Sequence, residues 1–137
     1  MAVEVLRPRT YIQAAACLPP AEENRSPGGV PLTETVSRIV AELRQGLEEL
    51  YGPRLERMVL FGSQARGEAT PDSDVDVLVV LHGDVRPIEE IRRTGGLVSE
   101  VSLHAGIDVA VTFISADRFR SETSPFVLNV RRDGVAV

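Results

Sequence analysis

An apolar run that opens with two carboxylates constrains this chain more than any other feature of its sequence. Residues 74–81 read D-V-D-V-L-V-V-L, which predicts a buried strand. Side chains alternate between the faces of a strand, so Asp74 and Asp76 share one face. Without a cation between them, each carboxylate would raise the pKa of the other and lose hydration. The other face, which can pack on helices, carries Val75, Val77, Val79 and Leu81.

The composition is that of one soluble globular domain, and it excludes several kinds of chemistry. With 137 residues, of which 43% are hydrophobic and 26% charged, the chain can bury one core but has little room for two. All 15 basic residues are arginine, so the lysine of a P-loop or of a Schiff base is missing. The net charge of −5 argues against direct binding of nucleic acid.

The cysteine count and the hydropathy pattern favour a cytoplasmic protein. The single cysteine, Cys17, permits neither an internal disulfide nor a cysteine-based zinc cluster, which fits a reducing compartment. No apolar stretch approaches the roughly 20 residues that a membrane span needs. The N-terminus carries Glu4, Arg7 and Arg9 and lacks the apolar core of a signal peptide. We therefore expect no membrane contact.

Proline and glycine divide the chain into a lead-in and one domain. Residues 1–31 contain five prolines and predict a flexible N-terminal extension or a translation start placed too far upstream. The alternative is a docking arm around Tyr11 and Ile12. Residues 32–137 form the predicted domain.

The domain shows the order helix, strand, strand, helix, strand, helix, with strands at 58–61, 74–81 and 107–114. The expected fold is a small α/β (α+β) domain whose mixed β-sheet has its helices packed mainly on one face. The apolar tail 135–137 is a candidate contact strand.

Capping residues and apolar spacing mark the three helices. The first begins at the cap Thr33 and ends at Gly52-Pro53, the second begins at Pro87, and the third spans 124–132. The apolar face of the first helix is predicted to carry Val36, Ile39, Val40, Leu43, Leu47, Leu50 and Tyr51. That of the second is predicted to carry Ile88, Ile91, Val98 and Val101.

Three aspartates form the candidate metal site. Asp108 stands at the start of the third apolar strand, as Asp74 and Asp76 do at the start of the second. If the two strands are neighbours, the three carboxylates converge. Oxygen ligands favour Mg²⁺ or Mn²⁺ over zinc, and three carboxylates suit two ions that share ligands. Alternatively, Asp108 caps a helix or pairs with an arginine.

A Gly-Ser pair upstream of the carboxylates is the candidate phosphate site. Gly62 allows close approach of the backbone to a ligand, and Ser63 offers a hydroxyl and an N–H group. Arg66 could pair with phosphate or brace the carboxylate loop. Ser73 is a further candidate hydrogen-bond donor to phosphate. A short helix at 64–66 would add a helix N-terminus. The two histidines, His82 and His104, are interpreted as surface or loop residues.

These residues resemble a known family. Gly62-Ser63, ten intervening residues and Asp74-Val75-Asp76 reproduce the G-S-x10-D-x-D signature of the polymerase-β-like nucleotidyltransferase superfamily. The S-x-A-R-G run at 63–67 and the ending P-F-V-L-N-V-R-R-D-G at 125–134 look typical of its minimal members, the antitoxin partners of HEPN-domain toxins. The resemblance covers residues 32–137.

The resemblance implies a role for each matching residue. Asp74 and Asp76 would hold Mg²⁺, Asp108 would complete a second metal site and help to deprotonate the acceptor hydroxyl, and Gly62 and Ser63 would hold the β- and γ-phosphates. AMP would pass from ATP to a hydroxyl, in characterised antitoxins a tyrosine of the toxin, a ribonuclease. The chain would then be the antitoxin of a type VII-like toxin–antitoxin pair, with the acceptor site supplied by the partner or by another copy of the chain.

Other functions fit part of the pattern. A binding module could mask its partner while the metal site stays idle, although such a module gains nothing from clustered carboxylates. A small-molecule nucleotidyltransferase of the antibiotic-modifying kind usually has a second, helical domain. A templated polymerase is disfavoured by size and charge, and a glycosyltransferase explains the D-x-D but not the Gly-Ser pair.

Overall fold

A mixed sheet of four strands organises the part of the chain that the computed structural model describes, residues 32–70 and 72–137. The strands, in the spatial order β3-β2-β1-β4, are β1 (Leu55–Phe61), β2 (Val75–Leu81), β3 (Val109–Ser115) and β4 (Val135–Ala136). β2 pairs parallel with β3 and antiparallel with β1, and β4 pairs antiparallel with β1. The predicted α/β class with a small mixed sheet is confirmed. The predicted N-terminal extension, 1–31, lies outside the described residues.

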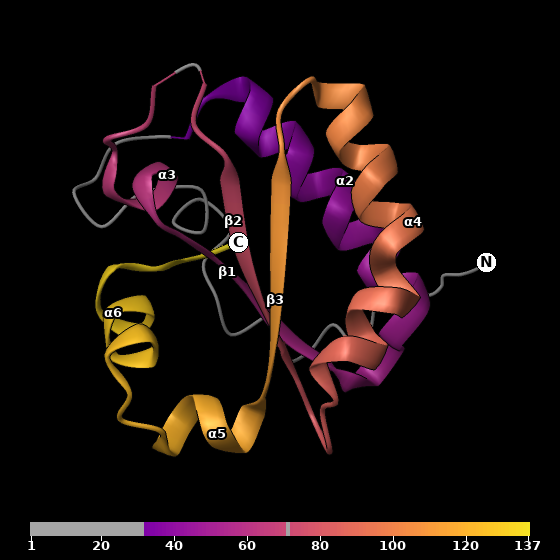
Figure 1. The fold of residues 1–137 in the computed structure, drawn as a ribbon, viewed down its shortest axis with the longest axis vertical. Helices are drawn as coiled ribbons and strands as arrows, with labels where there is room; N and C mark the ends of the chain where they lie inside the picture. The colour runs from indigo at the N-terminus through magenta and orange to yellow at the C-terminus, as the bar shows by residue number, and fades with distance from the viewer. Residues whose placement is uncertain (1–31, 71) are drawn as a thin grey trace.

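Two layers of helices enclose the sheet. The two long helices, α2 (Glu34–Tyr51) and α4 (Pro87–Ala105), pack side by side against one face, as Figure 1 shows. The short helices α5 (Ala116–Ser121) and α6 (Pro125–Asp133) cover the opposite face and bury a second, smaller core. Most of the helical cover therefore lies on one face, as expected, but the other face is not bare.

β2 is one of the two inner strands and is buried on both faces. Its alternate residues Val75, Val77, Val79 and Leu81 pack into the larger core under α2 and α4, as predicted. Leu78 and Val80 point the other way and join the smaller core with Val127 and Val130 of α6. This double burial explains why the run is apolar at almost every position rather than at every second one.

Local capping chemistry sets the helix ends, as predicted. The backbone N–H of Val36 donates to the Thr33 hydroxyl at 3.2 Å, which caps α2. Gly52 ends α2 with a positive φ of 53°, and a 3₁₀ turn, η1 (Gly52–Arg54), follows. Ser124 caps α6 in the same way as Thr33 caps α2, and Pro125 is its first residue.

The predicted apolar faces of the two long helices are partly wrong. Leu50 is 44% exposed, and Ile88 and Ile91 are 68% and 53% exposed. In their place α4 buries Glu90 and Thr94. Helical spacing allowed either set of residues to face the core, and the packing of α4 on α2 selected the polar one.

A hydrogen bond between α2 and α4 makes the burial of Glu90 tolerable. The hydroxyl of Tyr51 donates to the Glu90 carboxylate at 2.6 Å, and Arg93 lies 3.6 Å from the same carboxylate oxygen. Burial, reinforced by Glu90, raises the pKa of the Tyr51 hydroxyl above its ordinary value, so the hydroxyl stays a donor. The free-energy cost of burying this carboxylate is small, because its hydrogen bonds to water are replaced by one from Tyr51.

Two elements were not predicted as they occur. Helix α5 directly follows β3 and is capped by Ser115, whose hydroxyl accepts from the N–H of Arg118 at 3.2 Å. The tail considered as a contact strand pairs within the chain, where Val135 and Ala136 extend the sheet beside β1. The short strands of the sequence pattern also gain or lose residues at their ends, with β1 starting three residues earlier than expected.

None of the helices within residues 32–70 and 72–137 combines the length and the apolar character that crossing a membrane requires.

The burial difference between two leucines of α2 predicts a stability difference. Leu47→Ala should lower the free energy of unfolding by about 2–5 kcal/mol, because Leu47 is fully buried and its loss leaves a cavity. Leu50→Ala, the matched control, should change it by less than about 0.5 kcal/mol. Urea unfolding followed by circular dichroism measures both. Equal losses would contradict the packing of α2 described above.

Candidate active site

The two carboxylates of the sequence motif lie at the start of β2, where the strand emerges from between its neighbours. Asp74 immediately precedes β2 and is exposed, whereas Asp76 is its second residue and is half-buried. Asp76 pairs with Phe61 of β1 on one side and with Ala110 of β3 on the other. Strand alternation places Asp76 on the same face as Leu78 and Val80, the face covered farther along by α5 and α6.

Gly62 is in direct contact with this carboxylate. It follows β1, adopts a positive φ of 78° and precedes the single-turn helix α3 (Ser63–Arg66). A Cβ atom at this position would lie 2.8 Å from Oδ2 of Asp76, closer than real Cβ atoms approach an oxygen. The sequence predicted close approach of a ligand here. The structure adds that a side chain at this position would require the Asp76 carboxylate to shift.

The electrostatics of the pair are unfavourable without a cation. Burial, and then the negative charge of Asp74, raise the pKa of Asp76 above its ordinary value. Both effects penalise the ionised form, and a divalent cation bound between the carboxylates would reverse them. The residues therefore fit a hard cation such as Mg²⁺, because the donors are carboxylate oxygens.

Asp108 reaches the same end of the sheet as the pair. It immediately precedes β3, and its carbonyl oxygen accepts the backbone N–H of Val75 at 2.9 Å. The parallel register, extended back by one residue from Val75 and Val109, puts Asp108 next to Asp74. No three His, Cys, Asp or Glu side chains within residues 32–70 and 72–137 are grouped closely enough to hold a metal ion as they stand. The backbone segments that carry Asp74, Asp76 and Asp108 thus lie side by side, and the charge of Asp74 acts on the pKa of Asp76.

The remaining candidates surround this strand end. The short helix expected at 64–66 is present as α3 and begins one residue earlier, at Ser63. Arg66 donates to the Glu68 carboxylate at 2.8 Å, so it braces the loop that leads to Asp74. The Ser73 hydroxyl accepts the N–H of Thr70 at 2.9 Å and holds the same loop.

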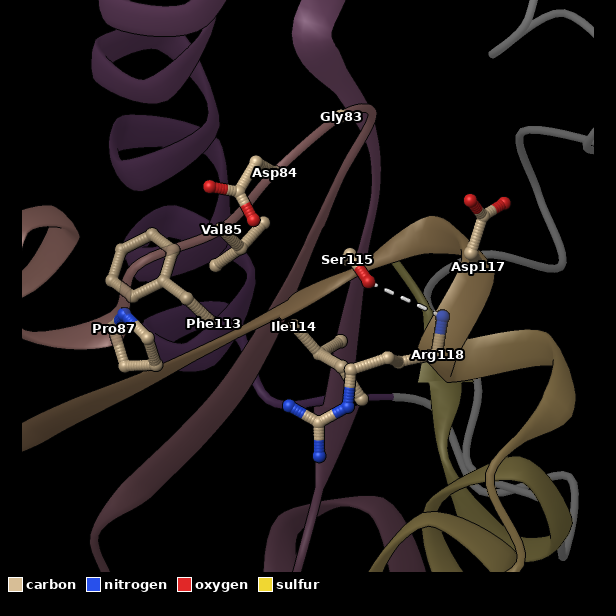
Figure 2. Close-up of a pocket in the computed structure, with 9 residues that line it drawn as sticks. All are labelled: Gly83, Asp84, Val85, Pro87, Phe113, Ile114, Ser115, Asp117 and Arg118. Carbon is tan, nitrogen blue, oxygen red and sulfur yellow. Dashed lines mark hydrogen bonds between the residues drawn. The ribbon is translucent and has the colours of Figure 1, made fainter.

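A cavity of about 390 Å³ lies elsewhere, at the opposite end of β2 and β3 (Figure 2). Val85, after β2, and Phe113, near the end of β3, are among its lining residues, together with Arg118 of α5. A seven-residue strand spans roughly 20 Å, so this cavity is well separated from the carboxylates. It takes no part in the candidate site.

Both histidines are surface residues, as predicted. His82 lies after β2, 3.6 Å from the Glu56 carboxylate, and His104 lies in the last turn of α4, 2.8 Å from Glu42. His82 follows β2 and therefore lies at the opposite end of that strand from Asp76.

The family assignment rests on a match over most of the domain. Residues 40–133, well over half of the chain, match the family model described as "Nucleotidyltransferase domain". The chain belongs to this nucleotidyltransferase family. The matched range includes the Gly-Ser pair, all three aspartates and the sheet except β4. The resemblance drawn from the signature is thereby confirmed, together with the polymerase-β-like core.

Two curated relatives from Methanocaldococcus jannaschii are similar to parts of this nucleotidyltransferase. "Putative protein adenylyltransferase MJ0604" is 42% identical over 48 residues, which cover 35% of this chain and 46% of that protein. "Putative protein adenylyltransferase MJ0141" is 31% identical over 68 residues, which cover 50% of this chain and 68% of that protein. The match thus spans less than half of the first relative and about two thirds of the second.

The raised pKa of Asp76 predicts a stability that depends on pH. A carboxyl group whose pKa is raised on folding stabilises the fold below its unfolded pKa, and this contribution is lost as the pH rises through the folded value. Asp76→Asn should therefore raise the melting temperature of the metal-free nucleotidyltransferase at pH 7 and lose this advantage near pH 3.5. Asp72→Asn, on the exposed loop, is the control. Thermal unfolding in EDTA measures both, and a pH-independent difference would contradict the electrostatic cause.

The contact between Gly62 and Asp76 predicts an unequal cost of two glycine substitutions. Gly83→Ala places a side chain at a positive φ of 86° in open space, and should cost about 1–2 kcal/mol of unfolding free energy. Gly62→Ala suffers the same backbone strain and also displaces the Asp76 carboxylate, so it should cost more. Urea unfolding compares the two variants. A Gly62 variant as stable as the Gly83 variant would show that the carboxylate moves freely.

Proposed function

We propose that this nucleotidyltransferase transfers AMP from ATP to a hydroxyl group of a partner protein. The observation that carries the proposal is the contact of Gly62 with Asp76, which joins the candidate phosphate site to the carboxylate pair. Two relatives whose names describe protein adenylyltransferases support a protein as the acceptor.

The carboxylates would hold the metal ions. Asp74 and Asp76 would bind Mg²⁺, for which Mn²⁺ is an alternative, and Asp108 would complete the site of a second ion. When bound, such ions neutralise the negative charge of the phosphates and of the developing transition state. The raised pKa of Asp76 supports this role, because that carboxylate gains most from a neighbouring cation.

The chain's own residues would position the triphosphate. The backbone at Gly62 and the hydroxyl and N–H of Ser63 would bind the β- and γ-phosphates at the start of α3. Arg66, the last residue of α3, and Ser73, on the loop that follows, would add further contacts to the phosphates. Arg66 would then exchange its Glu68 partner for a phosphate oxygen. Most of the rate enhancement would then come from positioning and electrostatics.

The transfer itself is a substitution at phosphorus. The acceptor oxygen forms a bond to the α-phosphorus, the bond from that phosphorus to the bridging oxygen of the β-phosphate breaks, and pyrophosphate leaves. The proton of the acceptor hydroxyl passes to a general base, for which Asp108 is the candidate. Its exposed position at the entrance to β3 leaves it open to an incoming acceptor.

The partner that fits best is a HEPN-type ribonuclease toxin modified on a tyrosine. The support is the resemblance of the Gly-Ser and D-x-D residues, and of the ending 125–134, to the minimal nucleotidyltransferases that act as antitoxins of such toxins. Modification would neutralise the toxin. A binding module that only masks its partner is the alternative of a different class. The unfavourable charge of the Asp74–Asp76 pair argues against it, because masking has no use for that pair.

Labelling of the partner tests the proposal. The nucleotidyltransferase, incubated with ATP, Mg²⁺ and a co-expressed HEPN protein, should add the mass of AMP to that protein. Asp74→Asn combined with Asp76→Asn should abolish the labelling, because both ligands of the cation are weakened. Intact-protein mass spectrometry measures the product, and Asp72→Asn is the control.

Two results would redirect the proposal. Neutralisation of the toxin without any mass change would favour masking. Release of pyrophosphate with small hydroxylated acceptors and no protein partner would favour a small-molecule nucleotidyltransferase.

A further inference from the structure

An aromatic pair flanks the candidate site on the side opposite β3. The ring of Phe61 packs edge-on against that of Phe126, with ring centroids 5.4 Å apart and an interplanar angle of 86°. Phe61 is the last residue of β1 and pairs directly with Asp76 across the sheet. Directly paired residues of antiparallel strands share one face, so the Phe61 ring and the Asp76 carboxylate are neighbours.

Phe126 is unusual among the aromatic residues of the domain. It is 43% exposed, and no other aromatic residue in the described ranges 32–70 and 72–137 is classed as exposed. It lies in the first turn of α6, one turn before Val130, which is buried in the smaller core. Helix α6 therefore places the ring beyond the edge of that core and against Phe61, beside the start of β2, where Asp76 lies.

We infer that Phe126, supported by Phe61, binds the base of the nucleotide by stacking. This inference rests on the proposed function, since it concerns the nucleotide that Asp74 and Asp76 would engage through its phosphates. Every base has an aromatic face, and stacking on an exposed ring is a common way to hold one. The separation suits this role, because Phe61, which is paired with Asp76, lies between Phe126 and that carboxylate, and the ribose would span the gap between base and phosphates.

The surroundings of the ring favour a base over a phosphate or a peptide side chain. Phe126 packs against the phenyl ring of Phe61, which carries no charge and interacts through dispersion and its quadrupole. Stacking of this kind tolerates any base and favours purines, whose rings are larger. The base would thus be held mainly by contact area, and the phosphates by the residues at the start of α3.

A comparison of ATP with inorganic tripolyphosphate tests the inference. Phe126→Leu keeps apolar bulk against Phe61 but removes the aromatic face, and Phe126→Ala removes both. Each should weaken ATP binding in Mg²⁺ by roughly 5- to 50-fold. Binding of tripolyphosphate, which has no base, should be unchanged. Phe126→Tyr should bind ATP as the wild type does. Isothermal titration calorimetry measures the dissociation constants, and in the transfer reaction the loss should appear in KM rather than in kcat.

The same helix provides a matched control. Leu128→Ala removes another exposed apolar side chain of α6, 45% exposed, and should alter neither dissociation constant. Melting curves recorded first show that each variant is folded, and the leucine and tyrosine variants keep the test decisive if the alanine variant is unstable. Equal weakening of ATP and tripolyphosphate, or no weakening of either, would overturn the base-stacking role. A folded wild type that binds neither compound would instead overturn the proposed function.

Discussion

The burial of β2 on both faces is the constraint on which the rest of the structure depends. A strand with a helical layer on each side can carry polar side chains only where it enters or leaves the sheet. β2 does so at its start, where Asp76 lies between the end of β1 and the start of β3. The position of the charged pair is therefore a consequence of how the two cores are built, since the remainder of the strand is occupied by apolar contacts.

This strand end concentrates unfavourable features that a ligand would relieve. The carboxylates of Asp74 and Asp76 repel one another, and burial further penalises the charge on Asp76. Gly62, at a positive φ that residues with a side chain rarely adopt, lies against Asp76. The β1–β2 ladder ends with Phe61 opposite Asp76, which places Gly62, the next residue, beside that carboxylate. The proposed function would give these features a common chemical purpose, the handling of a metal-bound nucleotide, and they lie within the range that matches the nucleotidyltransferase family.

The smaller core links the C-terminal helices to this site. α5 and α6 pack on Leu78 and Val80, which lie farther along the same face of β2 as Asp76. β4 follows α6 and pairs with β1, which ties the end of the chain to the strand that leads into Gly62. The helix that completes the fold is thus also the element that brings Phe126 beside the site.

Local physics made much of the fold and of the candidate site predictable from the sequence alone. Alternation marked β2 and the face of its valines, Thr33 and Gly52 marked the ends of α2, and the Gly-Ser and D-x-D spacing marked the family. The tertiary structure decided what depends on residues far apart in the chain. It buried Glu90 of α4 instead of Ile88, because Tyr51, 39 residues earlier, supplies a hydrogen bond that no periodicity reveals. It also decided that Gly62 touches Asp76 and that Asp108 lies beside Asp74, because both depend on how neighbouring strands align and not on the order of residues within one of them.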